Sequence, residues 1–286
     1  MSLRYAKRMD NIKASEIREL LKLTEKPEII SFAGGLPAPE LFPVEELEKV
    51  SSEVLEEQGT TALQYGPTEG YKPLRVEIIK RMEKVGVECK LDDILVTSGA
   101  QQGLDFSGRI FLNPGDVVLC ESPSYLGAIN AFRAYEPEFI SVPTDENGMV
   151  MEELEDILKN NDRVRFIYVI PDFQNPSGKT WSIERRKKLV ELANEYNVAI
   201  IEDNPYGELR FEGEYYPAVK HYDTEGRVIF LGTFSKIFCP GLRLGWVCAE
   251  KEVLNKFILA KQGADLQSST ISQMQTAKFL EEYDID

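Results

Sequence analysis

The regular alternation of two kinds of segment constrains the fold of this chain most. Short runs of β-branched and apolar residues are separated by longer segments with helical periodicity. Continuous apolar runs of this length are typical of strands that are buried on both faces. The runs span residues 93–99, 116–122, 139–143, 164–171, 198–206, 227–235 and 243–249. The order predicts an α/β fold: three layers, α/β/α, around a mostly parallel seven-stranded sheet.

Amphipathic patterns between the runs predict the covering helices. Two of them, "MEELEDILKN" and "SIERRKKLVELANEY", precede and follow the fourth run. A further helix is expected around residues 12–23, and the Gly- and Pro-rich stretch 31–43 separates it from the rest. The last pattern, "SSTISQMQTAKFLEEY", has no capping or stop residue, so the chain is expected to end within a helix.

Composition narrows the function to small-molecule chemistry. The net charge of −15 disfavours nucleic acid and anionic membranes as partners. There is no apolar segment of membrane-spanning length and no signal-peptide pattern, which predicts a cytoplasmic protein. The four cysteines form no CxxC pair, and we expect no metal site. The single histidine, His221, lies in a polar run and is expected at the surface, which leaves Ser-His-Asp catalysis with little basis.

Residues with chemical potential follow the ends of four predicted strands. The backbone of Gly99, Ala100 and Gln101 opens a helix, where free N–H groups suit a phosphate. Asp203 ends an apolar strand, either as a cap for the next turn or as a functional carboxylate. Two more follow other strands: Asn175 precedes a proline and fits simple turn chemistry, and Tyr125 fits either a core position or a ring stacked on a flat ligand.

A lysine in a stretch of apolar and small residues indicates that these residues bind one common ligand. Lys236 lies in "GTFSKIFCPGLRLG", one residue after Ser235 and seven before Arg243. A lone lysine is usually a surface residue, but a buried one without a carboxylate partner is usually kept for chemistry. Parallel strands bring all these residues to one sheet edge, where ligands bind. A lysine, a phosphate seat, an acid, an amide and a ring together match pyridoxal 5′-phosphate (PLP).

The sequence resembles the fold-type I PLP-dependent aminotransferases of class I/II along nearly its whole length. Within them it is most similar to the 2-aminoadipate and kynurenine aminotransferase group. The motifs that carry this resemblance are "SFAGGLPAPELFP", "LQYGPTEGYKPLR", "PDFQNPSG", "EDNPY" and "GTFSKIFCPGLRLGW".

The resemblance implies a role for each of the residues above. Lys236 attaches PLP covalently and later moves the substrate proton, and Asp203 faces the pyridine nitrogen. Asn175 and Tyr206 bind the phenolic oxygen of the cofactor, and Tyr125 stacks on its ring. The phosphate ligands are Thr233, Ser235 and Arg243, with the amides of Gly99, Ala100 and Gln101.

Three further positions follow from the same resemblance. Tyr65 reaches the PLP phosphate of a partner subunit, which implies a homodimer with shared active sites. Arg18 and Gly35 belong to an N-terminal segment that covers the substrate, and Asn175 also contacts it. The expected substrates are an α-amino acid, such as 2-aminoadipate or an aromatic or kynurenine-like one, and a 2-oxo acid such as 2-oxoglutarate.

The resemblance also predicts the domain organisation. Residues 1–44 form the N-terminal helix and substrate-covering segment, and residues 45–286 form the PLP-binding large domain. The small domain is incomplete, because family members continue beyond "FLEEYDID" into a C-terminal part that carries the arginine for the substrate α-carboxylate. We expect the chain to be a truncated piece of a full aminotransferase.

Two alternatives share the same cofactor residues. A β-lyase or decarboxylase uses the same scaffold and differs in which Cα bond stands perpendicular to the cofactor ring. The effector half of a MocR-type transcriptional regulator would need a basic DNA-binding domain ahead of this core. Only about forty residues precede the first large-domain helix, which is too few for one.

Overall fold

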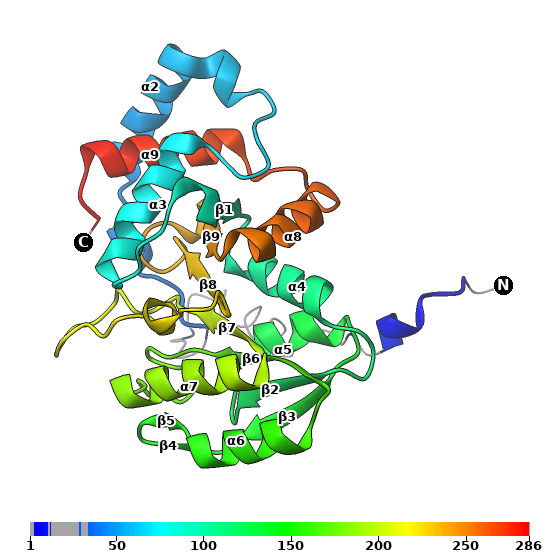
Figure 1. Cartoon of the computed structure of the whole chain (residues 1–286). Helices are drawn as coiled ribbons and strands as arrows, with labels where there is room; N and C mark the ends of the chain where they lie inside the picture. The colour runs from blue at the N-terminus through cyan, green and yellow to red at the C-terminus, as the bar shows by residue number, and fades with distance from the viewer. Residues whose placement is uncertain (1–2, 11, 13–28, 30–33, 286) are drawn as a thin grey trace.

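A seven-stranded sheet runs through the centre of the molecule in a computed structural model that describes residues 3–10, 12, 29 and 34–285 (Figure 1). The strand order is β1-β9-β8-β7-β6-β2-β3. The strands are β1 (Ile94–Thr97), β2 (Val117–Glu121), β3 (Glu138–Val142), β6 (Val164–Val169), β7 (Ala199–Asp203), β8 (Val228–Thr233) and β9 (Gly245–Cys248). Each overlaps one of the seven predicted runs, which confirms the predicted sheet.

The sheet is mostly parallel, as predicted. Parallel pairing joins β3 to β2, β2 to β6, β6 to β7 and β7 to β8. Strand β9 is antiparallel to both of its neighbours, β8 and β1. A short hairpin, β4 (Thr144–Asp145) with β5 (Gly148–Met149), was not predicted, because strands of two residues leave no periodicity to detect.

Helices cover both faces of the sheet and form the expected three layers. They are α2 (Val44–Ala62), α3 (Lys72–Lys84), α4 (Ala100–Phe111), α5 (Leu126–Arg133), α6 (Met151–Asn160), α7 (Ile183–Tyr196), α8 (Lys251–Gln262) and α9 (Thr270–Glu282). Short 3-10 turns occur at Lys7–Asp10, Pro39–Leu41, Leu91–Asp93, Val219–Tyr222 and Pro240–Leu242. None of the helices in the described residues is long and apolar enough to cross a bilayer.

Alternation along the strands divides the apolar core between the two faces. In β6, Phe166 and Tyr168 join a cluster with α4, α5 and α8, whereas Ile167 and Val169 join one with α6 and α7. A third cluster connects β1, β8 and β9 to α2, α3 and α9. Successive residues of a strand point to opposite faces, and both faces are buried. Residues that point either way are therefore apolar, which explains the unbroken apolar runs.

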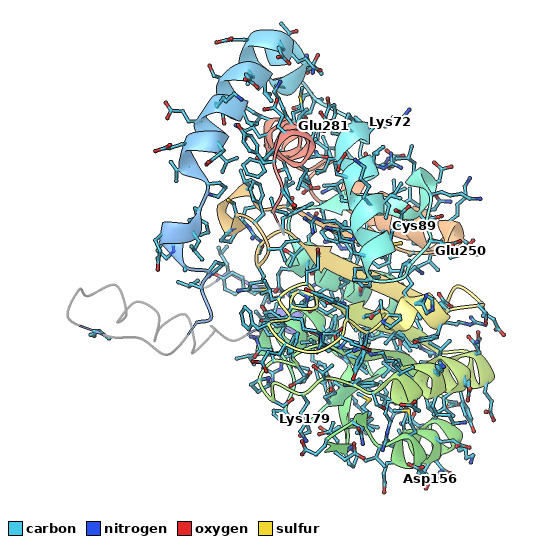
Figure 2. The ribbon with its side chains drawn as sticks, turned by 90° about the vertical axis from the view of Figure 1, so that its left-hand side faces the viewer. Lys72, Cys89, Asp156, Lys179, Glu250 and Glu281 are labelled. Carbon is cyan, nitrogen blue, oxygen red and sulfur yellow. The ribbon has the colours of Figure 1, made fainter. Side chains whose placement is uncertain are left out.

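The two ends of the molecule are built from different sets of elements. Helices α2, α3 and α9 lie together at one end, and α6 with the β4–β5 hairpin lies at the other (Figure 1). With side chains drawn, Lys72 and Glu281 mark the first end, and Asp156 and Lys179 the second (Figure 2). Lys278 of α9 pairs with Glu57 of α2, 3.1 Å away, across the helix contact.

Two predictions about the chain ends have different outcomes. Helix α9 ends at Glu282, and the N–H of Tyr283 donates to the Phe279 carbonyl, 2.8 Å away. The prediction that the chain ends within a helix is therefore wrong, since the backbone leaves the helix before Asp284. The helix expected around residues 12–23 lies outside the described residues, apart from residue 12.

The start of α7 gives a direct test of local helix stability. The Ser182 side chain caps this helix by accepting from the N–H of Arg185, 3.3 Å away. Replacing Ser182 by Ala removes that acceptor and should lower the free energy of unfolding by about 1 kcal/mol in urea denaturation. As a control, Ser52→Ala in the exposed interior of α2 should leave stability unchanged or slightly raised, since Ala favours helix. Equal losses in both variants would contradict the cap.

Candidate active site

The candidate site lies at the carboxyl ends of the strands, where the connecting loops leave the sheet. Asn175 follows β6, Tyr206 follows β7 and Lys236 follows β8. Because these three strands are adjacent and parallel, their carboxyl ends lie side by side. The runs predicted as strands extend beyond β7 and β8, and these extra residues are the loops that carry site side chains.

Lys236 is partly buried and has a backbone oxygen as its partner. Its Nζ donates to the carbonyl of Gly35, 2.8 Å away. Burial lowers the pKa of its ammonium below the usual value. Among the described residues, no carboxylate forms an ion pair with it. The lysine is thus held in a setting that favours the neutral amine.

Asp203 is buried at the end of β7 and uses only half of its carboxylate. Its Oδ2 accepts from the Tyr168 hydroxyl, 2.9 Å away, while Oδ1 is buried without a hydrogen-bond partner in the described part of the chain. Burial raises the pKa of this carboxyl to about 6, against the hydrogen bond from Tyr168. A buried acceptor without a donor is costly, so this oxygen favours a ligand that brings an N–H.

The neighbouring acid, Glu202, points to the opposite face, as strand alternation requires. Its two oxygens accept from the N–H groups of Val219 and Lys220, 2.7 and 2.8 Å away. Burial raises the pKa of this carboxyl to about 7. Glu202 therefore fixes the 3-10 turn at Val219–Tyr222, and Asp203 is the acid that the strand presents to the site.

Asn175 and Tyr206 lie together, as the sequence predicted. The amide of Asn175 donates to the Tyr206 hydroxyl at 3.4 Å. Burial raises the pKa of this hydroxyl, and the charge of Asp203 adds to the effect. The loop that carries Asn175 is held by Asp172, whose carboxylate accepts from both terminal nitrogens of the buried Arg186, 2.8 and 3.1 Å away. Such a bidentate pair fixes the loop strongly.

The predicted phosphate seat is formed where three segments meet. The first N–H groups of α4 have no partner within the helix, and Gly99, which precedes them, has a φ of 77° that suits glycine. A Cβ on Gly99 would lie 2.5 Å from Nη2 of Arg243. Arg243 in turn donates to Ser235 Oγ, 3.3 Å away. The helix start, the arginine and the serine thus surround one small region.

Two other predicted phosphate ligands have partners within the protein. The Thr233 hydroxyl accepts from the N–H of Ser235, 3.1 Å away, and donates to the Leu244 carbonyl, 3.4 Å away. The side chain of Gln101 donates to the Gly127 carbonyl, 3.0 Å away. These bonds order the turns around the seat, and phosphate binding by Thr233 and by the Ala100 and Gln101 amides stays a prediction.

The remaining predicted residues differ in how the structure places them. Tyr125 begins α5 and its ring lies against Gly127, where a Cβ would be 2.4 Å from the tyrosine Cζ. The carbonyl of Gly35 accepts from Lys236, which places this residue at the site. The Tyr65 side chain is 80% exposed. Arg18 lies outside the described residues.

Sequence reasoning missed the tyrosine that holds Asp203. Tyr168 lies in the middle of an apolar run, where an aromatic residue reads as core, and its hydroxyl gives no periodic signal. His221 is exposed as expected, and the four cysteines are free. No cluster of three metal-ligating side chains is present within the residues that the structure describes.

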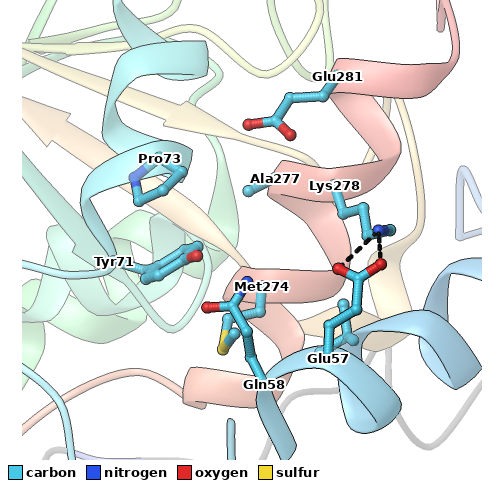
Figure 3. Close-up of a pocket in the computed structure, with 9 residues that line it drawn as sticks. Glu57, Gln58, Tyr71, Pro73, Met274, Ala277, Lys278 and Glu281 are labelled. Atoms are coloured by element: carbon cyan, nitrogen blue, oxygen red, sulfur yellow. Dashed lines mark hydrogen bonds and ion pairs between the residues drawn. The ribbon is translucent and has the colours of Figure 1, made fainter. Parts of the chain in front are cut away.

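A surface pocket lies away from these residues, between α2, α3 and α9 (Figure 3). Its lining includes Gln58, Tyr71, Met274 and Glu281, and none of the predicted site residues. The hydrogen bonds between Lys278 and Glu57 border it. The pocket belongs to the helix layer and does not define the site.

Comparison with known proteins identifies the family. The family model "Aminotransferase class I and II" matches residues 32–285. An aromatic-amino-acid aminotransferase of Thermococcus litoralis is 49% identical over 97% of this chain and 68% of its own length, and a 2-aminoadipate transaminase of Thermus thermophilus is 46% identical over 97% and 69%. The crystal structure of the kynurenine aminotransferase of Pyrococcus horikoshii, in complex with PMP, superposes with a TM-score of 0.91 at 45% identity, covering 97% of this chain and 70% of that one.

The chain therefore belongs to the aminotransferase class I and II family. This membership confirms the resemblance seen in the sequence, the three-layer α/β fold, the aminotransferase activity and the PLP cofactor. The residues fit that cofactor on physical grounds as well. The unpartnered Asp203 Oδ1 suits a protonated ring nitrogen, and the region between Gly99, Ser235 and Arg243 suits a phosphate.

Buried carboxyls predict how the stability of the cofactor-free protein depends on pH. Asp203 has a pKa of about 6 in the folded state against 3.8 when unfolded, so the folded protein keeps a proton that the unfolded chain has lost. Stability from this group is present at low pH and is lost as pH rises through about 6. Between about pH 5 and 7, the unfolding free energy of the wild type should therefore fall by about 1 kcal/mol more than that of Asp203→Asn.

Urea denaturation of the cofactor-free protein at the two pH values measures this effect. Asp156→Asn, on the exposed face of α6, is the matched control and should keep the wild-type pH dependence. An unchanged dependence in Asp203→Asn would show that the carboxyl is ionised across this range.

Proposed function

We propose that this chain transfers the amino group of an α-amino acid to a 2-oxo acid such as 2-oxoglutarate. The observation that carries this is Lys236, a lysine whose pKa is lowered by burial and which lies beside Gly35, with no carboxylate partner among the described residues. Relatives named for aromatic amino acids, 2-aminoadipate and kynurenine support amino donors with an aromatic or long polar side chain.

The chemistry divides between the cofactor and the protein. PLP, when bound, supplies the aldehyde that receives the amino group and the ring that withdraws electrons from the substrate Cα. Lys236 would hold the cofactor through Nζ, and its neutral amine would take the proton from the substrate Cα. Its low pKa serves both tasks, because only the unprotonated nitrogen is a nucleophile or a base.

Asp203 provides the electrostatic partner for the ring nitrogen. An ionised carboxylate favours the protonated form of a nitrogen that faces it, and that proton increases electron withdrawal by the ring. Tyr168 fixes the orientation of the carboxylate through Oδ2 and leaves Oδ1 to bind the ligand. Asn175 and Tyr206 are joined by their hydrogen bond and would bind the phenolic oxygen of the cofactor, and Tyr125 would bind its ring.

The phosphate is assigned to the start of α4 and to two side chains after β8. Gly99, Ala100 and Gln101 supply backbone N–H groups, and Ser235 and Arg243 supply a hydroxyl and a guanidinium. Thr233 supports this set by holding the turn between them. The positive end of the helix dipole and the arginine both favour a dianion at this place.

The described residues also bear on substrate binding, assembly and location. Gly35 contacts Lys236 and supports a substrate-covering role for the segment 1–44, to which we also assign Arg18; residues 45–286 are assigned to the PLP-binding large domain. The exposed ring of Tyr65 supports a homodimer in which it binds the partner's phosphate. We propose a cytoplasmic location on the basis of composition and charge.

Chemical trapping tests the assignment of Lys236. Borohydride reduction of the PLP-loaded protein should leave the pyridoxyl group on the peptide that contains Lys236, as shown by mass spectrometry. Lys236→Ala should bind PLP without a covalent bond and lose turnover by several orders of magnitude. Lys256→Ala, on the exposed side of α8, is the control and should behave as wild type. A label on any other lysine would overturn the assignment.

Mixing two inactive variants tests whether active sites are shared between subunits. In a dimer of Tyr65→Ala with Lys236→Ala chains, one of the two sites has Lys236 from the first chain and Tyr65 from the second. Random pairing makes half of the dimers mixed, so roughly a quarter of wild-type activity should return after the chains are dissociated and reassociated. The experiment is done in a form that extends beyond Asp286 and includes the C-terminal region of the relatives. Activity that stays at the sum of the two variants would place Tyr65 outside the partner's site.

A further inference from the structure

A second lysine, Lys261 in α8, is fully buried and has no role in the chemistry proposed above. Its exposed fraction is 0%, and burial lowers its pKa even though Asp265 opposes this effect. Lysines are rarely buried to this extent unless all their hydrogen-bonding capacity is used. Here it is used, since Nζ donates to Gln102 Oε1 at 2.8 Å and to the two Asp265 oxygens at 2.9 and 3.0 Å.

The partners of Lys261 form a closed network around the start of α4. The Gln102 side chain accepts from the N–H of Ser98 at 2.9 Å and donates to Asp265 Oδ2 at 2.8 Å. The Ser98 hydroxyl donates to the same Asp265 oxygen at 3.1 Å and lies 3.3 Å from the hydroxyl of Ser268. Ser98 and Gln102 are therefore held to each other, and both are held to Asp265.

This network holds both ends of the turn whose backbone N–H groups are proposed to bind the phosphate. Gly99, Ala100 and Gln101 lie between Ser98 and Gln102, and Gly99 adopts a positive φ and has no side chain of its own to restrain it. A glycine turn loses more entropy on ordering than other turns. Fixing both flanking residues before the ligand arrives lowers the cost of binding, which is the general advantage of preorganisation.

Lys261 also affects the net charge next to the proposed phosphate site at the start of α4. Asp265 hydrogen-bonds to both residues that flank the phosphate seat, and its negative charge opposes a phosphate dianion. Lys261 pairs with this carboxylate from a buried position and cancels its charge. Without the lysine, the seat would keep an uncompensated anion beside it.

We propose that Lys261 is a positioning residue for the cofactor phosphate, acting through Gln102, Asp265 and Ser98 and touching neither cofactor nor substrate. The proposal rests on the proposed function, because it takes PLP as the ligand of the start of α4. It predicts that loss of Lys261 weakens the binding of the phosphate group specifically. The aldehyde and the ring, which other residues bind, should be affected little.

A comparison of PLP with pyridoxal, which lacks the phosphate, isolates this effect. Both aldehydes form the same bond with Lys236, so the ratio of their dissociation constants reports the phosphate contribution. Titration of the cofactor-free protein, followed by absorbance, gives both constants. In Lys261→Met the constant for PLP should rise by about 10- to 100-fold, the range of a lost charged hydrogen bond. The constant for pyridoxal should change by less than about threefold.

Two further variants make the test independent of the folding of Lys261→Met. Gln102→Leu breaks the same network at a partly exposed position and should also weaken PLP and not pyridoxal. Lys251→Met removes a lysine from the same helix, 67% exposed and paired only with exposed Asp92, and should match wild type for both ligands. If Lys261→Met does not fold, Gln102→Leu decides.

The outcomes separate this proposal from the function on which it rests. If wild-type protein binds neither aldehyde through Lys236, the proposed function fails. If wild type binds PLP and the two network variants do so equally well, the role of Lys261 is overturned. Equal weakening of PLP and pyridoxal would overturn it too, since that result indicates a general structural defect.

Discussion

The close approach of three backbone segments around Gly245 is the constraint on which the site depends. A Cβ at this residue would lie 2.7 Å from the N of Ala100 and 2.7 Å from the carbonyl oxygen of Gly232. Strand β9 therefore begins in contact with both the start of α4 and strand β8. This contact places the predicted phosphate seat next to the loop that carries Ser235 and Lys236. A side chain at Gly245 would have to move backbone on both sides, and backbone in a packed sheet yields little.

The two buried lysines show how neighbouring groups separate chemistry from support. Within the described part of the chain, Lys236 has one neutral partner, the Gly35 carbonyl, and burial is what lowers its pKa. Lys261 has a carboxylate and an amide, and its contacts fill the donors of its ammonium group. In the first setting nothing opposes the effect of burial, which favours a neutral amine that can react. In the second, Asp265 opposes the effect of burial, and the hydrogen bonds of the lysine hold a turn. The residue type is the same, and the difference lies in the partners that the fold provides.

Most of the fold was predictable, because strands that are buried on both faces have continuous apolar sequences. The seven apolar runs could be read as strands, and the segments 151–160 and 182–196 as helices, because their patterns continue over whole elements. The position at which a single helix ends was harder to predict. The helical pattern at the end of the chain gave no stop, yet α9 ends at Glu282, where Tyr283 takes an extended conformation.

The sequence by itself determined the succession of strands and helices along the chain, and which reactive residues lie at or after the end of a strand: Asp203, Asn175 and Lys236. These follow from local periodicity and from motifs, both of which are carried by residues close together in the chain. Only the tertiary structure decided that Tyr168 donates to one oxygen of Asp203, and that Lys261 donates to Gln102 from more than 150 positions away. Such contacts join residues far apart in sequence, and a side chain's partners across a sheet or between helices leave no pattern along the chain until the backbone brings them together.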